Sequence, residues 1–316
     1  MLHNYPNFTF VGGDITSPQD IGSCIRKHEI DTVIHLAALS SVENSLKNPF
    51  GFTETNIHGT QVVLEVANSN NVKKFIQMSS FEAYGATKPG ADGHKEDEPL
   101  SPNNSYGAGK AAAEMIVNAF NNSTPLQTII VRANNIYGPN QFPDSKDAGS
   151  FGGDVTLTIL PAEIIPKFIM LLRHGHKLTL QGAGDGKRRY LYVGDAVNAF
   201  NLLLHKGVHG ETYNLGSYDE VSHRQLCETL LETVKPPSYD GSDVEAWIDR
   251  RPARPYTDFG STMDVSKLRA LGWDKNVSFE EGLKRTVEWY TAHGDTWWGG
   301  AEKIIYPDVK ANGITA

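Results

Sequence analysis

A tyrosine and a lysine four residues apart carry the clearest chemistry in this sequence. Tyr106 and Lys110 stand in Tyr106-Gly107-Ala108-Gly109-Lys110, which opens an alanine-rich segment typical of a helix. Residues at this spacing lie on one helical face, so the ammonium group can sit beside the phenol and favour its ionised form. An ionisable phenol is what a base needs to accept the proton of a hydroxyl that is being oxidised. The same spacing is also typical of an ordinary solvated pair on a helix.

Two serines just before this segment strengthen the catalytic interpretation. Residues 75–78 form a short apolar run that ends in Ser79-Ser80. Such a run predicts a buried parallel strand, which would deliver both hydroxyls to the carboxyl edge of a sheet. Ligand sites in open parallel sheets lie at that edge.

The rest of the chain alternates between strand and helix patterns. A βαβ alternation of this kind predicts a parallel, doubly wound sheet with right-handed crossovers. The predicted strands span 8–12, 31–38, 74–78, 128–132, 177–180 and 211–216. One helix is predicted to end at residue 25, and further helices are predicted at 56–66, 106–119, 164–172, 196–204 and 279–292.

With these motifs the chain resembles the extended short-chain dehydrogenases/reductases, and among them the nucleoside-diphosphate-glucose 4,6-dehydratases, from about Phe8 to about Trp298. The resemblance implies an α/β fold with a Rossmann-type NAD-binding domain and a smaller α/β substrate lobe. The implied boundaries are 1–143 for the NAD domain, with later strands interleaved from 188–216, then an insertion at 144–163, the substrate lobe at 164–298 and a flexible tail at 299–316.

The resemblance also implies an activity and a set of catalytic residues. In the resembled enzymes NAD takes a hydride from C4 of a nucleotide sugar, water leaves across C5 and C6, and the hydride returns to C6. Tyr106, assisted by Lys110, then corresponds to the base at the C4 hydroxyl, Ser80 to the hydroxyl that orients it, and Glu82 to the base at C5.

Further contact positions are carried over from the same resemblance. For NAD they are Asp14, Ile15, Leu36, Ala37, Ala38 and Thr55, together with Tyr106 and Lys110. For the nucleotide sugar they are Ser40, Ser80, Asn135, Arg188 and His223, of which Arg188 suits a diphosphate because a guanidinium offers paired donors. Each of the smaller residues also has an ordinary role in packing or helix capping.

The sequence departs from the resembled family at four places. Nothing before Phe8 supplies the strand and glycine-rich turn that hold a pyrophosphate, so we expect an amino-terminally truncated domain without its first βαβ unit. Phe81 stands where the dehydratases have an aspartic acid that protonates the leaving hydroxyl. Gly260 replaces an arginine, and Glu163 replaces a lysine near the nucleotide. These departures predict impaired activity.

Composition excludes several other classes of protein. The chain has 316 residues, a net charge of −8 and no basic run, which argues against nucleic acid and anionic membranes as partners. The amino terminus lacks the pattern of a signal peptide, and Cys24 and Cys227 predict packed thiols in a reducing cytoplasm. The histidines show no metal-ligand spacing. In relatives, helices corresponding to 56–66 and 106–119 form a dimer face, so a homodimer is possible.

Three functions remain open at this point. The first is a 4,6-dehydratase acting on a dTDP- or UDP-glucose. The second is a relative that stops at C4 oxidation, of the epimerase or decarboxylase type, which would tolerate Phe81. The third is a catalytically dead paralogue or defective gene product. Purified protein that carries nicotinamide absorbance and forms a 4-ketone would separate these possibilities.

Overall fold

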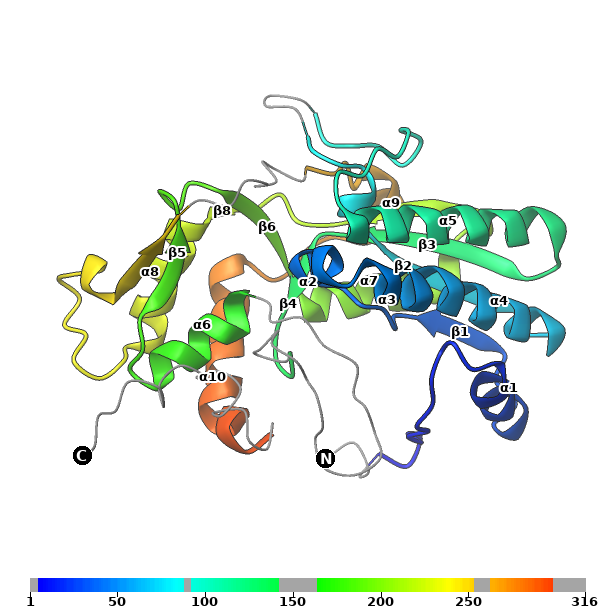
Figure 1. Ribbon diagram of the computed structural model, residues 1–316, viewed down its shortest axis with the longest axis horizontal. Helices are drawn as coiled ribbons and strands as arrows, with labels where there is room; N and C mark the ends of the chain where they lie inside the picture. Colours follow the sequence, from blue (N-terminus) through cyan, green and yellow to red (C-terminus); the bar gives the residue numbers. More distant parts are fainter. Residues whose placement is uncertain (1–4, 88–91, 142–163, 253–261, 298–316) are drawn as a thin grey trace.

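A computed structural model describes residues 5–87, 92–141, 164–252 and 262–297. The predicted insertion at 144–163 and tail at 299–316 lie outside these ranges, as do Glu163, Gly260 and Ser261. The described chain forms two sheet regions with helices packed around them (Figure 1).

The main sheet confirms the predicted parallel α/β fold. Its order is β1 (Thr32–His35), β2 (Lys74–Ser80), β3 (Gln127–Ala133) and β7 (Thr212–Leu215), and every neighbouring pair is parallel. The predicted strands at 31–38, 74–78, 128–132 and 211–216 are these four. Strand β2 extends through both predicted serines, and Ser80 pairs in register with Ala133 at the carboxyl edge.

Consecutive residues of the central strands point to opposite faces of the main sheet, and helices cover both faces. Phe75 packs among α1 (Pro18–Lys27), α4 (Gly59–Ser69) and α5 (Ser105–Ser123), whereas Ile76 faces α7 (Val193–Lys206) and α9 (Ser266–Ala270). The alternation follows from the two-residue period of a strand, since apolar residues on both faces require helices on both faces.

Strand β1 is the outermost strand of the main sheet, and the predicted strand at 8–12 is wrong. Residues 8–12 are irregular, and Phe10 and Val11 are exposed. An extended segment becomes a strand only when a neighbouring strand pairs with its backbone, and no described strand pairs with residues 8–12. The predicted helix that follows is correct: α1 begins after Ser17, whose side chain accepts a hydrogen bond from the backbone N–H of Asp20.

A buried asparagine fixes the chain as it leaves β1. Asn56 donates from Nδ2 to the carbonyl of Leu39 and accepts from the N–H of Leu39, both at 2.8 Å. Asn56 lies in a short π-helical segment, Glu54–His58, that runs directly into α4, so the predicted helix 56–66 is one continuous helical stretch with two hydrogen-bond patterns. The helices α2 (Val42–Lys47) and α3 (Pro49–Thr53) fill the connection.

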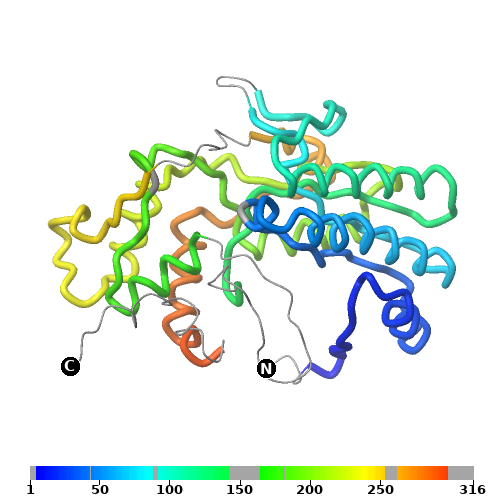
Figure 2. Tube along the Cα trace, viewed as in Figure 1, coloured from blue at the N-terminus to red at the C-terminus, as the bar shows by residue number. Residues whose placement is uncertain are grey.

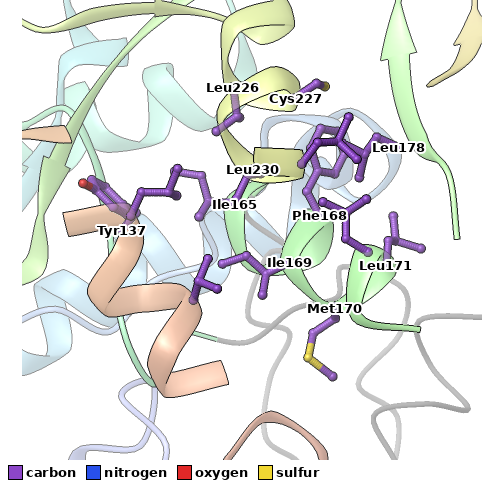
Figure 3. Close-up of a cluster of buried hydrophobic side chains, with 14 of the residues drawn as sticks. Tyr137, Ile165, Phe168, Ile169, Met170, Leu171, Leu178, Leu226, Cys227 and Leu230 are labelled. Carbon is purple, nitrogen blue, oxygen red and sulfur yellow. The ribbon is translucent and has the colours of Figure 1, made fainter. Parts of the chain in front are cut away.

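The second region has its own core, and the tube in Figure 2 shows it beside the main sheet. Buried apolar residues of α6 (Ile164–Arg173), α8 (His223–Val234) and α10 (Phe279–Trp297) pack together with Leu178 and Tyr137 (Figure 3). Two small sheets border this core: β4 (Asn135–Tyr137), β6 (Lys187–Tyr192) and β8 (Glu220–Ser222) form one, and β5 (Leu178–Gln181) and β9 (Ile248–Arg251) form the other. Of the segment 188–216, β7 therefore joins the main sheet and β6 does not.

Among the described residues no helix is both long and apolar enough to cross a membrane. The same ranges contain no group of three or more histidine, cysteine or acidic residues placed to hold a metal ion.

Candidate active site

The start of α5 brings Tyr106 and Lys110 to the carboxyl end of β2. The Lys110 Nζ lies 6.0 Å from the centre of the Tyr106 ring and donates a hydrogen bond to the carbonyl of Met78 at 3.0 Å. Lys110 is 4 % exposed, while Tyr106 is only partly buried. The ammonium group is therefore anchored beneath a tyrosine that solvent can reach, as the helical spacing predicts.

Burial changes the acidity of this lysine. Desolvation lowers the pKa of Lys110 from 10.5 to about 8, and the negative charge of Glu114 opposes the shift. Glu114 lies four residues further along α5, so Tyr106, Lys110 and Glu114 follow one face of the helix. A lysine with this pKa can exchange a proton near neutral pH.

Ser80 and Glu82 meet at the end of β2, where a 3₁₀ turn (η3, Phe81–Ala83) begins. The Ser80 Oγ accepts a hydrogen bond from the backbone N–H of Glu82 at 3.2 Å, which leaves its own proton available as a donor. The Glu82 carboxylate is buried and accepts from the Nδ2 of Asn104 at 2.8 Å. All four predicted catalytic residues thus lie where β2 and α5 converge.

Phe81 has an apolar environment. Its side chain is 6 % exposed and packs with Tyr84, Met263 and Leu100. The ring therefore contributes to packing beside the candidate site and can donate no proton there.

Behind these residues lies a buried ionic network that sequence analysis did not identify. Arg132 on β3 donates to both carboxylate oxygens of Glu114, with the shortest contact 2.7 Å, and to the hydroxyl of Tyr84 at 2.7 Å. Tyr84 in turn donates to Asn214 at 2.8 Å, and Ser79 donates to Glu114. A charged residue inside the apolar pattern of residues 128–133 was the one signal in the sequence that could have revealed this network.

A second buried polar residue, His35, lies close enough to Lys110 for the lysine charge to act on its imidazole. Burial, and secondarily the charge of Lys110, lower the pKa of His35 to about 3, so the imidazole is neutral. The Thr60 hydroxyl donates to the carbonyl of Asn56 at 2.8 Å, so the His35 Nε2 must be the donor in its 3.1 Å contact with that hydroxyl. His35 thus fixes β1 against α4 without adding a charge beside Lys110.

Three of the predicted substrate residues, Asn135, Arg188 and His223, lie in the second region. Asn135 begins β4 two residues beyond Ala133, the register partner of Ser80. Its Nδ2 is buried without a described hydrogen-bond partner, and the residue lines a small pocket with Ile164, Ile165 and Tyr190 among its other walls. Buried polar groups usually have a hydrogen-bond partner, so this amide is an unsatisfied donor in the wall of the pocket.

Arg188 and His223 lie on paired strands and the helix that follows them. Arg188 on β6 pairs in register with Val221, and His223 is the first residue of α8, only two residues beyond Val221. Both side chains are partly buried, as is Ser40 in the loop after β1. The fold therefore groups Asn135, Arg188 and His223 in one sheet region and places Ser40 at the main sheet's edge.

The predicted cofactor residues follow β1 and precede α1. Leu36 and Ala37 are exposed, whereas Ala38 and Thr55 are partly buried. The Asp14 carboxylate accepts from the N–H and hydroxyl of Thr16, both at 2.8 Å, so it also forms the turn before α1. Ile15 packs against α4, since a Cβ built at Gly59 would lie 2.8 Å from its Cδ1.

The predicted cofactor residues fit the nicotinamide end of a dinucleotide better than the pyrophosphate at its centre. Lys110 offers a cation, and Ala37 and Ala38 offer small side chains that would let a ligand approach the end of β1 closely. In the described ranges no glycine-rich turn leads from a strand into a helix beside β1, and such a turn is the usual site for the pyrophosphate.

Comparison with known proteins identifies the family of this chain. The sequence model of the family described as GDP-mannose 4,6 dehydratase matches residues 1–286. The chain belongs to this family. Over 306 residues it is 36 % identical to the dTDP-D-glucose 4,6-dehydratase of Mus musculus, covering 97 % of this chain and 80 % of that protein.

Two further relatives define the range of the family likeness. A trifunctional enzyme of Arabidopsis thaliana, whose name includes UDP-glucose 4,6-dehydratase, is 38 % identical over 304 residues, which cover 96 % of this chain but only 42 % of the plant protein. The chain thus spans about two-fifths of that relative. A crystal structure of the Streptomyces venezuelae dTDP-glucose 4,6-dehydratase with NAD bound superposes with a TM-score of 0.81 at 30 % identity, covering 94 % of this chain and 83 % of the other.

The lowered pKa of Lys110 predicts a pH dependence of stability. In the unfolded chain the pKa returns to about 10.5, so between pH 8 and 10.5 the unfolded state binds more protons than the folded state. The free energy of unfolding should therefore rise with pH in this window, by up to about 1.4 kcal/mol per pH unit. Urea unfolding of the wild type and of Lys110→Met across the window measures this rise. Parallel pH profiles for the two proteins would show that the pKa of Lys110 is not lowered in the folded state.

The network around Glu114 predicts a strong dependence on Arg132. Arg132→Met leaves a buried carboxylate without its opposite charge and should cost about 3–5 kcal/mol of unfolding free energy. The double variant Arg132→Met, Glu114→Leu should regain part of this loss, because neither member of the pair is then left buried without its partner, although Lys110 loses the charge of Glu114. Arg285→Met, which breaks the exposed pair with Glu281, is the matched control and should leave stability nearly unchanged. Equal losses for Arg132→Met and the double variant would contradict the role of the pair.

Proposed function

We propose that this chain binds NAD and a nucleoside-diphosphate hexose and oxidises the sugar at C4, as a 4,6-dehydratase whose elimination step is slow. The single observation that carries the proposal is the convergence of Tyr106, Lys110, Ser80 and Glu82 at the carboxyl end of β2. The dehydratase names of the relatives at 36 % and 38 % identity support the substrate class. NAD in the superposed crystal structure supports the cofactor.

The first step would use Tyr106 and Lys110. When bound, NAD supplies the acceptor for the C4 hydride. Tyr106 accepts the proton of the C4 hydroxyl, and the Ser80 hydroxyl donates to the same oxygen and holds it in place. The nearby ammonium group of Lys110 stabilises the tyrosinate that begins this step.

The second step would use Glu82. Once C4 is a ketone, the proton on C5 becomes acidic, and the buried Glu82 carboxylate is the candidate base for it. Loss of the C6 hydroxyl must follow, and the Phe81 ring offers no proton to that leaving group. A missing general acid costs about 10²- to 10⁴-fold in rate, so elimination should be the slow step.

Phe81 also favours a second candidate function. An epimerase-type or decarboxylase-type relative that oxidises C4 and never expels the C6 hydroxyl has no need of an acid at this position. The two functions differ in a single product, because only the dehydratase yields a 4-keto-6-deoxy sugar.

The decisive experiment follows each step separately. Purified protein with added NAD is incubated in D₂O with UDP-glucose or dTDP-glucose. We expect absorbance of reduced nicotinamide and deuterium at C5, with slow formation of the 4-keto-6-deoxy product measured by mass spectrometry. Tyr106→Phe should abolish all three signals, because it lacks the oxygen that accepts the C4 proton. Phe81→Asp should raise product formation, because it restores a proton donor.

Two results would count against the proposal. Absence of both reduced nicotinamide and C5 exchange would overturn the oxidoreductase chemistry and favour a catalytically dead paralogue. Rapid dehydration by the wild type would instead show that another group supplies the proton and that Phe81 does not limit the reaction.

We further propose that the chain forms a homodimer through the helices on one face of the main sheet. The helices α2 and α3 pack beside α5, and the three helices each expose a large apolar side chain: Leu46, Phe50 and Met115. Figure 1 shows these helices and α4 on the same side of the sheet. Exposed apolar residues gathered on one face are typical of an interface between subunits.

Charge substitutions test the dimer. The wild type should elute and scatter light as a dimer, and Phe50→Lys should be a monomer because a charge would be buried at the interface. Val197→Lys is the matched control: Val197 is 60 % exposed on α7, across the sheet, and this variant should remain dimeric. A monomeric wild type, or dissociation by Val197→Lys alone, would refute this interface.

A further inference from the structure

The side-chain oxygen and nitrogen of Asn104 make hydrogen bonds to two different elements of the site. Oδ1 accepts a hydrogen bond from the backbone N–H of Gly107 at 2.8 Å and so caps the amino terminus of α5. Nδ2 donates to Oε2 of Glu82 at 2.8 Å and also contacts Oδ1 of Asn103 at 3.1 Å. The capping contact fixes the helix that carries Tyr106, and the donor contact fixes a carboxylate on a different element.

The surrounding backbone leaves little freedom in this arrangement. A Cβ built at Gly107 would lie 2.5 Å from the carbonyl oxygen of Glu82, so the first turn of α5 rests directly on the turn that carries Glu82. The backbone N–H of Glu82 is held in turn by Ser80. With the backbone fixed in this way, the direction of the Glu82 side chain depends on what its carboxylate contacts.

We propose that Asn104 is a positioning residue that sets the Glu82 carboxylate relative to Tyr106, so that bases for the C4 hydroxyl and the C5 proton reach adjacent atoms of one sugar. The inference rests on the proposed function and goes beyond it, because Asn104 need not touch the substrate. A base must lie within hydrogen-bond reach of the proton that it removes, and a displacement of about 1 Å can cost 10²-fold in rate. Tyr106 is two residues from Asn104 and remains in place as long as the helix is capped.

Substitutions that keep the cap and remove the donor test this role. Aspartate and serine are both good amino-terminal capping residues, so Asn104→Asp and Asn104→Ser retain an acceptor for Gly107. Aspartate has no donor and adds a like charge beside Glu82, whereas the serine hydroxyl sits on a shorter side chain than the amide Nδ2 and is drawn away from the Glu82 carboxylate. Asn48→Asp is the matched control, because Asn48 caps α3 through Oδ1 in the same way at 3.1 Å.

The measurement is the ratio of deuterium exchange at C5 to formation of reduced nicotinamide, in the same sample with UDP-glucose or dTDP-glucose and NAD. We expect Asn104→Asp to lower the ratio about 100-fold and Asn104→Ser about 10-fold, with C4 oxidation nearly unchanged. Asn48→Asp should leave the ratio unaltered. A purely structural role for Asn104 would reduce both rates together, and an unchanged ratio in the Asn104 variants would overturn the proposal.

A structural measurement keeps the proposal testable if the wild type oxidises no sugar, which would be a failure of the proposed function alone. Crystal structures of the wild type and Asn104→Ser then decide. A displaced Glu82 carboxylate with α5 unmoved supports the positioning role, and a carboxylate that keeps its place overturns it.

Discussion

The candidate site depends on a lysine buried against a backbone carbonyl. Lys110 is 4 % exposed, and its Nζ bonds to the last apolar residue of β2, Met78, before the two serines. An ammonium group in such a place is costly unless neighbouring groups compensate it. The surrounding polar groups can be understood as this compensation: Glu114 one turn further along the helix supplies negative charge, and His35 remains neutral.

The ion pair of Glu114 with Arg132 extends this compensation into the sheet. Arg132 also holds Tyr84, which bonds to Asn214 on β7, so the network reaches from α5 across β3 to the far strand. Burial raises the pKa of Tyr84 to about 12, which keeps this phenol protonated. Tyr84 therefore serves the structure, whereas Tyr106, which is only partly buried, is the tyrosine proposed to take part in the reaction.

Phe81 shows how a substitution can suit the fold and oppose the expected reaction. Its ring fills an apolar cluster with Tyr84 and Met263, next to the polar groups of the candidate site. The packing of this ring is compatible with C4 oxidation, which needs no acid at C6. In the proposed reaction, the Phe81 ring can give no proton to the elimination of water.

The sequence by itself determined the parallel α/β class, the strand that ends in Ser79-Ser80, and the one-face spacing of Tyr106 and Lys110. Residues on one face of a strand recur every two positions, and residues on one face of a helix recur about every four, so local patterns in the sequence encode these features. The sequence also misled at residues 8–12, where an apolar pattern exists without a strand to pair with.

Only the tertiary structure decided which groups surround those residues. Tyr84 and Asn214 are 130 positions apart, Arg132 and Glu114 come from different elements, and Asn104 meets Glu82 across a turn. The placement of β6 outside the main sheet and β7 within it was decided in the same way. Contacts of this kind arise from the packing of whole elements, and no periodicity in the chain records which distant polar atoms burial will bring together.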